Sequence, residues 1–483
     1  MDEAALIGID VGTTSVKAVM FTANGHRLAE FAASYPTIRH PPDRVEQDPE
    51  DWHRLVSSAL AGFAARAEAR SVRAICLTSQ VNTHVFVDRE LRPLHPAIVW
   101  QDGRAAAAGA RLDATIPVED KIAWIGAPIP LDASHALSRM AWMKAAHPAI
   151  WKAAAHVMLP RDFLLARLTG AVVTDPISAV GLVSPDLTYA RSLIALLPGA
   201  AKRLPPLQDP LSIAGRMRQG GPFAGIPVIT GLMDAWASLL GLGVASEGQA
   251  MYLSGTSEVL GLISPRITNE PGVITFPPWA GITLHAGPTQ AGGASLDWVA
   301  RLLGQEPGAL ARDAAGITAQ SPLFLPHLQG ERAPLWDPSA RGAFAGLTGA
   351  CGPAEIAAAV MEGVAFSARL AMEALQRSAG VIPSQIQTGG GGAASDRWSQ
   401  IRADVFGRTF LRVAGRDPGA TGAALMAGVG VGILPDLAQA ATAMIRTDRV
   451  FTPDGAARAL ADDRFAIWQR LYQQLRPINA ALI

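Results

Sequence analysis

The chain has 483 residues, of which 49% are hydrophobic and 17% charged, a composition that supports two to four folded units and excludes a mainly disordered protein. Its 41 basic and 41 acidic residues cancel, so no overall field attracts nucleic acid or an anionic membrane. Two cysteines are too few for a disulfide framework, and the acidic start lacks the basic, apolar pattern of a secretory signal. We expect a cytoplasmic globular protein with no nucleic-acid or membrane partner.

The first predicted elements are two β-rich runs, residues 6–11 and 16–22, joined by the hairpin signal Gly12-Thr13-Thr14-Ser15. A tight turn at Asn24-Gly25 predicts a third strand over residues 27–35. Asp48 and Pro49 then start a helix that is apolar on one face, and residues 72–78 read as a buried strand. Three antiparallel strands, a helix and a returning strand are the opening of a ribonuclease H-like, or actin-like, lobe.

The second half opens with the same pattern. Residues 250–253 and 258–263 flank the turn 254–257, and strand-like sequence follows at 272–286. Helical patterns near 295–304 and 353–378 precede a run of four glycines that opens another helix. The sequence therefore predicts an α/β fold of two actin-like lobes, residues 1–245 and 246–483, with a cleft between them where a small molecule binds.

The turn after the first strand has the residues of a phosphate loop. Gly12 permits a tight turn, and the amides and hydroxyls of Thr13 and Thr14 are donors for phosphate oxygens. Asp10, at the end of the buried strand, is a candidate ligand for Mg²⁺, which prefers carboxylate and water oxygens. The alternative is an ordinary hairpin with a polar tip.

The second lobe has two further glycine-containing turns. Ser254-Gly255-Thr256-Ser257 offers the same donors as the first turn, and the glycine run at 389–392 places backbone at a helix N-terminus, where a nucleotide is readily bound. Neither a Walker A motif nor a Rossmann fingerprint is present. Taken alone, the glycine run is also compatible with a surface loop.

Asp234 is the candidate catalytic carboxylate. It follows a strand predicted at 226–230 and begins a helix rich in small residues. A carboxylate there either caps the helix or acts as the general base that accepts the proton of an attacking hydroxyl. Motifs of zinc proteases and serine hydrolases are absent, and the histidines are scattered.

Several segments in this order resemble the FGGY family of carbohydrate kinases, and most of all xylulokinases. The resemblance covers about residues 5–440. Its marks are IGIDVGTTSVKAV at 7–19, PAIVWQDGRA at 96–105, LPRDFLLARLTG at 159–170, TGLMDAWA at 230–237, YLSGTS at 252–257, GERAPLWDPSARGAFAGLT at 330–348 and GGGGAASDRWSQIRADVFG at 389–407.

The resemblance implies a kinase that uses ATP and Mg²⁺ to phosphorylate a primary hydroxyl of a ketopentose, the 5-hydroxyl in D-xylulose. It implies Asp234 as the base and Asp10 as the carboxylate near the magnesium ion. The remaining implied contacts are Thr13 and Thr14 on the first phosphate loop, Gly255 and Thr256 on the second, Gly390, Gly391 and Ser395 near the adenosine, Val81 and Asn82 on the sugar, and Asp102 and Arg104 in a neighbouring substrate segment. A homodimer and closure of the lobes over the substrates are further expectations.

Two departures from the xylulokinase pattern lie on the sugar side. The usual Gln-Met-His-Gly is replaced by Gln80-Val81-Asn82-Thr83, with His84 two places beyond the expected histidine. The base is usually followed by Asn-Ala-Ala, whereas Ala235-Trp236-Ala237 follow Asp234. Other pentuloses and polyols, such as ribulose, erythritol and ribitol, remain alternative substrates. A nucleotide-binding regulator with the same fold and no catalysis is the alternative from a different class.

Overall fold

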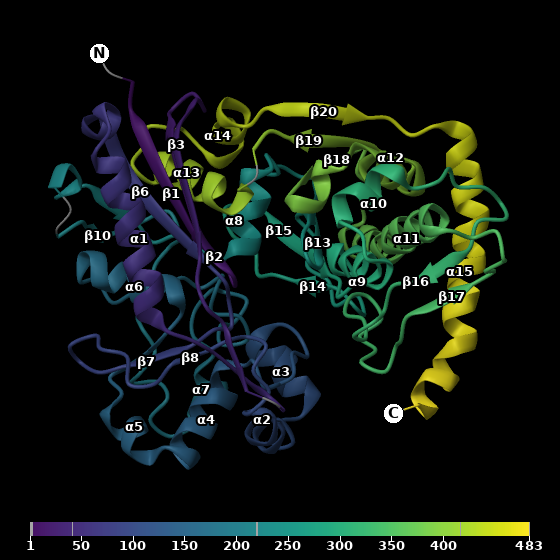
Figure 1. Ribbon diagram of the computed structural model, residues 1–483. Coiled ribbons are helices and arrows are strands. Elements are labelled where there is room, and N and C mark those ends of the chain that lie inside the picture. The colour runs from purple at the N-terminus through teal and green to yellow at the C-terminus, as the bar shows by residue number, and fades with distance from the viewer. Residues whose placement is uncertain (1–2, 41, 219–220, 416, 483) are drawn as a thin grey trace. The chain divides into compact units, whose positions relative to one another are not determined.

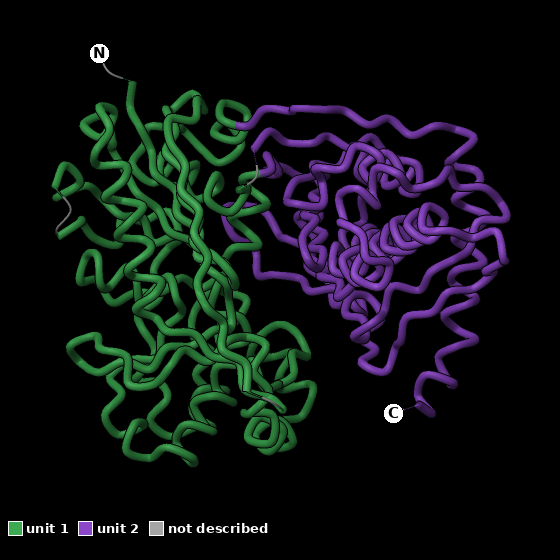
Figure 2. Tube along the Cα trace, in the orientation of Figure 1, with its two compact units in different colours: residues 1–241, 417–444 green, residues 242–416, 445–483 purple. Residues whose placement is uncertain are grey.

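The computed structural model describes residues 3–40, 42–218, 221–415 and 417–482. The chain divides into two compact units, Met1–Gly241 with Asp417–Met444, and Leu242–Arg416 with Ile445–Ile483 (Figure 2). The two units are called unit 1 and unit 2 below. Each unit contains one large mixed sheet with helices packed against it (Figure 1).

The large sheet of unit 1 has the strand order β10-β11-β6-β1-β2-β3. Strands β1, β2 and β3 are antiparallel neighbours, whereas β6 and β11 run parallel to β1. These strands are β1 (Ala5–Val11), β2 (Ser15–Thr22), β3 (Arg27–Ser34), β6 (Val72–Ser79), β10 (Ile213–Arg216) and β11 (Pro227–Ile229). The strands and the helix predicted for the opening of the chain are thus confirmed, and Asp48 caps that helix by accepting a hydrogen bond from the amide of Glu50.

Alternate residues of β1 face different helices, as the pleat of a strand requires. Ile7, Ile9 and Val11 lie in the apolar core that includes α1 (Pro49–Ala64). The residues between them approach α13 (Pro418–Gly430): a Cβ on Gly8 would lie 1.9 Å from the carbonyl oxygen of Ala420. Asp10 therefore projects from the α13 face of the sheet.

Helix α13 also packs closely against α8 (Asp234–Gly241). A Cβ on Gly422 would lie 1.8 Å from the carbonyl oxygen of Ala237, and a Cβ on Gly241 would lie 1.9 Å from that of Pro418. The close approach of the two helices thus depends on glycines in both. Because Asp234 is the first residue of α8, this packing also holds the backbone of Asp234 in place.

The rest of unit 1 has a second apolar core and several small sheets. One sheet joins β4 (Ile38–His40), β5 (Arg44–Gln47) and β8 (Ala97–Ile98), and another pairs β7 (Val85–Val87) with β9 (His156–Met158). The second core includes Phe86, Leu137 and Met140. The remaining helices of unit 1 are α2 (Ala106–Asp113), α3 (Val118–Ile125), α4 (Ala136–Ala146), α5 (Pro148–Ala153), α6 (Pro160–Thr169), α7 (Arg191–Ala195), α14 (Leu437–Met444) and the 3₁₀ turns η1 (Ala67–Ser71) and η2 (Gly221–Phe223).

Unit 2 repeats the sheet order of unit 1. Its large sheet runs β14-β15-β13-β12-β18-β19-β20, in which β12, β13 and β15 are antiparallel neighbours and β18 and β19 continue in parallel from β12. Its strands are β12 (Ala250–Ser254), β13 (Glu258–Ser264), β14 (Ile274–Thr275), β15 (Thr283–Pro288), β18 (Gln385–Gly389), β19 (Thr409–Val413) and β20 (Thr447–Phe451). A separate antiparallel pair is formed by β16 (Leu323–Leu325) and β17 (Ala343–Ala345). The helices are α9 (Gly293–Leu303), α10 (Pro307–Asp313), α11 (Pro353–Ala379), η3 (Gly391–Ala394), α12 (Asp396–Phe406) and α15 (Gly455–Ala481).

The predicted fold class, two actin-like α/β lobes, is confirmed by this repeated topology. The observed division differs from the single boundary predicted between residues 245 and 246, because residues 417–444 pack with unit 1. Helix α13 is almost entirely apolar and small, so it lies on the sheet face formed by β1 and β6. In the described part of the chain, no helix is both long and apolar enough to cross a membrane.

Candidate active site

The candidate site of unit 1 lies at one edge of its sheet. Strands β1, β6 and β11 are parallel, so the loops that follow them emerge at the same edge. The amide of Gln80 donates to the carbonyl of Val11 over 2.9 Å, and the hydroxyl of Thr78 donates to the carbonyl of Leu232 over 2.6 Å. The loops that contain Thr13, Asn82 and Asp234 are therefore neighbours.

The loop predicted to bind phosphate, at residues 12–14, is held by aromatic side chains. The Tyr35 hydroxyl donates to the carbonyl of Gly12, and the Trp100 indole nitrogen donates to the Thr13 hydroxyl over 3.0 Å. The Thr13 side chain is half-buried, whereas Thr14 is exposed. The loop thus presents a free threonine beside one that the protein already orients.

Two carboxylates lie near this loop, and both have raised pKa values. Burial, reinforced by the charge of Asp234 and opposed by Lys17, raises the pKa of Asp10 to about 7. Burial raises the pKa of Asp234 to about 6, although its Oδ1 accepts a 2.8 Å hydrogen bond from the amide of Ala235. Asp10 Oδ1 is buried without a hydrogen-bond partner among the described residues. Burial is thus the main cause of the raised pKa of Asp10, and the charge of Asp234 adds to it, a combination that a bound cation would relieve.

The predicted sugar-contacting pair, Val81 and Asn82, is half-buried in the loop after β6. Asn82 has a φ of 54°, a left-handed conformation that asparagine tolerates better than most residues. Its carbonyl accepts from Nη1 of the buried Arg139, which also donates to the carbonyl of Ile98 over 2.6 Å. The Asn82 amide nitrogen lies 3.4 Å from the Ser134 hydroxyl. Arg139 thereby fixes the backbone of the residue that replaces the family's histidine.

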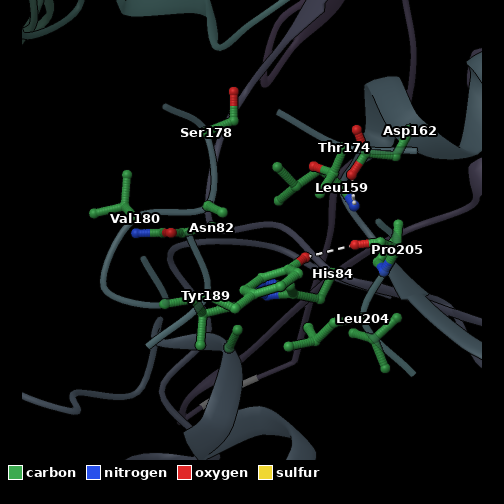
Figure 3. A pocket seen from close by; sticks show the side chains of 14 residues that line it. Asn82, His84, Leu159, Asp162, Thr174, Ser178, Val180, Tyr189, Leu204 and Pro205 are labelled. Carbon is green, nitrogen blue, oxygen red and sulfur yellow. Dashed lines mark hydrogen bonds between the residues drawn. The ribbon is translucent and has the colours of Figure 1, made fainter. Parts of the chain in front are cut away.

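His84 does not occupy the place of the missing histidine. Its ring is buried, Arg139 Nη1 donates to its Nδ1 over 3.1 Å, and burial holds its pKa well below the usual value. Figure 3 shows a hollow lined by Asn82, His84 and Tyr189, whose hydroxyl donates to the carbonyl of Pro205 over 2.7 Å. A neutral, buried histidine there contributes packing and one hydrogen bond rather than charge.

Asp102 and Arg104 form a buried ion pair with Glu46. Arg104 Nη2 lies 2.7 Å from both carboxylates, and Asp102 also accepts from the amide of Val45 over 2.6 Å. The Arg104 guanidinium lies over the ring of Trp142. Arg104 Nη1 is buried and has no partner within the described ranges. Most hydrogen bonds of Asp102 and Arg104 therefore hold their own segment in place. Arg104 Nη1 is the one nitrogen of this arginine that has no partner among the described residues.

In unit 2, the loop with Gly255 and Thr256 contacts the glycine run. Gly390 has a φ of 86°, and a Cβ there would lie 2.4 Å from the carbonyl oxygen of Ser254. The Gly255 and Thr256 carbonyls accept from the first amides of α9 over 2.9 and 3.0 Å. The two turns predicted to bind the nucleotide are thus brought together.

A buried arginine connects these two turns. Arg402 on α12 donates to the Ser254 hydroxyl over 2.7 Å, to the Gly392 carbonyl over 3.0 Å and to Glu258 over 3.0 Å. The Tyr252 hydroxyl donates to the same glutamate. Because the four side chains of this network are buried and bonded to one another, the network fixes the relative position of the two turns.

The other predicted adenosine contacts have different surroundings. Ser395 is the N-cap of α12, and its hydroxyl accepts from the amide of Trp398 over 3.2 Å. Gly391 is exposed, with open space where its side chain would lie. A ligand would therefore meet the backbone of Gly391 before it meets the serine hydroxyl.

Several residues that organise the site were not predicted as site residues, namely Tyr35, Gln47, Trp100, Arg139 and Arg402. Arg139 has no motif signal, because its partners are mostly backbone carbonyls distant in sequence. Arg402 lies inside the motif at 389–407, which was the signal available for it. Trp100 stands inside a motif that was noted for Asp102 and Arg104, and the motif was the signal available for it.

The sequences of both units match domains of one protein family. Residues 5–241 match the N-terminal domain, and residues 250–431 the C-terminal domain, of the FGGY family of carbohydrate kinases. The chain is 30% identical over 488 residues to a xylulose kinase of Escherichia coli (strain K12), covering 98% of this chain and 100% of the relative. It is 29% identical over 500 residues to a xylulose kinase of Bacillus subtilis (strain 168), covering 99% and 98%.

A solved structure shares the fold across the whole chain. The ligand-bound xylulose kinase from Lactobacillus acidophilus matches with a TM-score of 0.90 at 24% identity, covering 99% of this chain and 100% of that one. At this identity the structural match supports the fold alone, and the class of activity follows from the matches to the two family domains. The protein is therefore a phosphotransferase that belongs to the FGGY family of carbohydrate kinases.

Proposed function

We propose that the protein transfers the γ-phosphoryl group of ATP to a primary hydroxyl of a ketopentose, converting D-xylulose to D-xylulose 5-phosphate. The observation that carries the proposal is the pair of half-buried carboxylates, Asp10 and Asp234, beside the threonine loop at one edge of the unit 1 sheet. In phosphoryl transfer a protein mainly positions groups and neutralises charge, so few reacting side chains are needed.

In this proposal Asp234 is the general base. As the substrate oxygen bonds to the γ-phosphorus, the bond to the β–γ bridging oxygen breaks and ADP leaves with that electron pair. The hydroxyl proton passes to the carboxylate of Asp234. A pKa raised to about 6 keeps this group ionised near neutral pH and makes it a better proton acceptor than an ordinary aspartate.

Asp10 is the residue that would hold Mg²⁺. Its Oδ1 is buried without a partner among the described residues, and burial, reinforced by the charge of Asp234, raises its pKa, so a cation would relieve an existing cost. Within the described ranges, no cluster of three or more His, Cys, Asp or Glu side chains is placed to bind a metal ion. This fits Mg²⁺, which usually keeps several waters and binds one or two carboxylates together with phosphate oxygens. When bound, the ion neutralises charge on the phosphates.

For the nucleotide, we propose separate roles for the two units. Thr13 and Thr14 of unit 1 bind phosphate oxygens, as does the turn with Gly255 and Thr256 of unit 2. The backbone at Gly390 and Gly391 lies against the adenosine, next to the N-terminus of the helix that Ser395 caps. The support is that Arg402 holds the two unit 2 turns together in a fixed geometry.

On the sugar side, Val81 and Asn82 contact the substrate, and Arg104 Nη1 offers one further donor. The name of the relatives, xylulose kinase, supports xylulose as the substrate in this proposal. Asn82 favours a second candidate, another pentulose or a polyol such as ribulose, erythritol or ribitol, because an amide both donates and accepts hydrogen bonds. A buried polar contact of this kind discriminates strongly between hydroxyl arrangements.

A coupled ADP-release assay with magnesium and ATP against these sugars and polyols tests the proposal. We expect D-xylulose to give the highest kcat/KM, and Asp234→Asn to lower kcat by about 100-fold or more, the usual size of general-base catalysis. Asp209→Asn, at an exposed aspartate in the loop that precedes β10, is the control and should retain wild-type turnover. Full activity of Asp234→Asn would overturn the assigned base, and preference for another sugar would assign that sugar instead.

A further inference from the structure

Five residues of unit 1 form a closed ring of hydrogen bonds. Gln47 Nε2 donates to the Thr13 carbonyl over 2.8 Å, and Gln80 Nε2 donates to Gln47 Oε1 over 2.8 Å. The Thr83 hydroxyl donates to Gln80 Oε1 over 3.1 Å and accepts from the Trp100 amide over 3.1 Å. The Trp100 indole closes the ring by donating to the Thr13 hydroxyl over 3.0 Å.

The direction of each bond in the ring is determined by its chemistry. The Thr13 carbonyl can only accept, so the Gln47 amide nitrogen must face it and the Gln47 oxygen must face Gln80. The Gln80 oxygen is then left for the Thr83 hydroxyl. An indole nitrogen can only donate, so the Thr13 hydroxyl accepts from Trp100 and its own proton points elsewhere. The ring thus leaves Thr13 as a donor, the role that an anionic phosphate oxygen requires.

The ring joins the two loops on which the proposed function depends. Thr13 belongs to the first phosphate loop, whereas Gln80 and Thr83 flank Val81 and Asn82 in the sugar loop. Gln47, Gln80 and Thr83 are buried, with 1%, 1% and 0% of their surface exposed. A buried amide that loses its partner pays its full desolvation cost, so displacement of one loop is resisted through the other.

We propose that Gln47 is a positioning residue that couples the sugar loop to the first phosphate loop and holds the Thr13 hydroxyl as a donor to phosphate. This inference rests on the proposed kinase function. It adds that Gln47, which lies on β5 outside both loops, sets the alignment of the two substrates. Misalignment of reacting groups by about 1 Å can cost about 100-fold in rate, so the effect belongs to kcat rather than to binding.

A glutamate at position 47 gives the sharpest test. A protonated carboxylic acid has one donor and one acceptor oxygen and therefore reproduces the amide pattern, whereas the ionised form places a negative charge against the Thr13 carbonyl. We expect the kcat of Gln47→Glu, divided by that of the wild type at the same pH, to rise at least tenfold between pH 8.5 and pH 5.5. A ratio independent of pH would overturn the proposal, because a purely structural defect has no reason to follow this protonation.

A double-mutant cycle tests whether the ring acts as a unit. Gln47→Met and Thr83→Val remove side chains that do not bond each other, and each should lower kcat about 10- to 100-fold with a less than threefold change in the KM for sugar. The double variant should be no slower than the slower single variant, because either change already opens the ring. Multiplicative losses would show independent effects and would overturn the coupling.

The matched control is Thr37→Val. The Thr37 hydroxyl accepts from the same Gln47 nitrogen over 2.8 Å and donates weakly to the Thr13 carbonyl over 3.4 Å, but the five bonds that close the ring do not pass through it. We expect a less than threefold change in kcat, and a loss equal to that of Gln47→Met would contradict the special role of the ring. The two proposals can fail separately. If activity depends on the sugar and on Asp234 but the kcat losses of Gln47→Met and Thr83→Val multiply in the double variant, this inference is rejected and the proposed function stands.

Discussion

Asp10 and Asp234 show how position rather than residue type gives a carboxylate its chemistry. Asp10 lies at the carboxyl end of β1 and Asp234 follows β11, two strands that end at the same sheet edge, and burial is the largest cause of the raised pKa in each. The second cause differs, because the charge of Asp234 acts on Asp10 and Lys17 opposes it. Asp10, whose buried oxygen has no partner among the described residues, is suited to binding a cation, and Asp234, at the start of α8, is suited to accepting a proton.

The pKa of Asp234 predicts the acid limb of the pH–rate profile. Only the ionised carboxylate accepts a proton, so kcat/KM for the sugar should be constant above about pH 7 and fall about tenfold for each unit below the pKa of about 6. Rates between pH 5 and pH 9 at saturating magnesium would check this. Unchanged activity down to pH 5 would contradict a base with this pKa.

The raised pKa of Asp10 predicts a stability cost in the absence of metal. The folded state binds the Asp10 proton more tightly than the unfolded chain, so unfolding free energy falls as pH rises from about 4 towards 7 and the full cost remains above that. Asp10→Asn should therefore raise the unfolding free energy by about 1–2 kcal/mol at pH 8 in EDTA and abolish magnesium-dependent activity.

Urea titrations at pH 8 and pH 4.5 would measure the effect of Asp10→Asn. The gain should disappear at the lower pH, where the wild-type carboxyl is protonated in the folded state. A variant that is less stable at pH 8, or equally stabilised at both pH values, would contradict this account.

At the scale of elements, the strands and helices that hold the site were predictable, whereas the side-chain network among them was not. Hydrophobic alternation, caps and glycine turns located β1, α1 and the loops after β12 and β18, because these signals are local in sequence. Arg139 and Gln47 act through partners 34 to 57 residues away. Neither has a local signal, and only the folded chain brings the partners together.

The contact between α8 and α13 carries a prediction of its own. Alanine usually favours a helix over glycine by about 1 kcal/mol, but at Gly422 its Cβ would overlap the carbonyl oxygen of Ala237. The backbones must then separate, and overpacking of this kind costs about 1–3 kcal/mol. We expect Gly422→Ala to lower the unfolding free energy by about 2 kcal/mol and to lower activity, because α8 begins at Asp234.

Gly62→Ala is the matched control, since Gly62 lies in α1 with open space at its Cβ position. It should raise the unfolding free energy by up to about 1 kcal/mol. Chemical denaturation of both variants would measure the contrast. If Gly422→Ala were as stabilising as Gly62→Ala, the close packing of the two helices would be refuted.

At the scale of the whole molecule, the repeat of one sheet order was visible in the sequence as two strand–turn–strand openings. The assignment of α13 was not, because a helix of small apolar residues fits any buried face equally well by pattern. Its place against β1 depends on Gly8 and Ala420 meeting at close range, which is a property of shape rather than of periodicity. The structure accordingly divides unit 1 between two distant stretches of chain.

This divided unit has a consequence for synthesis on the ribosome. The face of β1 that α13 covers stays bare from the time residue 241 is made until residues 418–430 emerge, roughly 10–40 s at ordinary elongation rates. Neither unit is complete until late in synthesis, because unit 1 ends at residue 444 and unit 2 at residue 483. Nascent chains stalled within residues 242–416 expose an apolar sheet face, which makes them clients for chaperones and prone to aggregate.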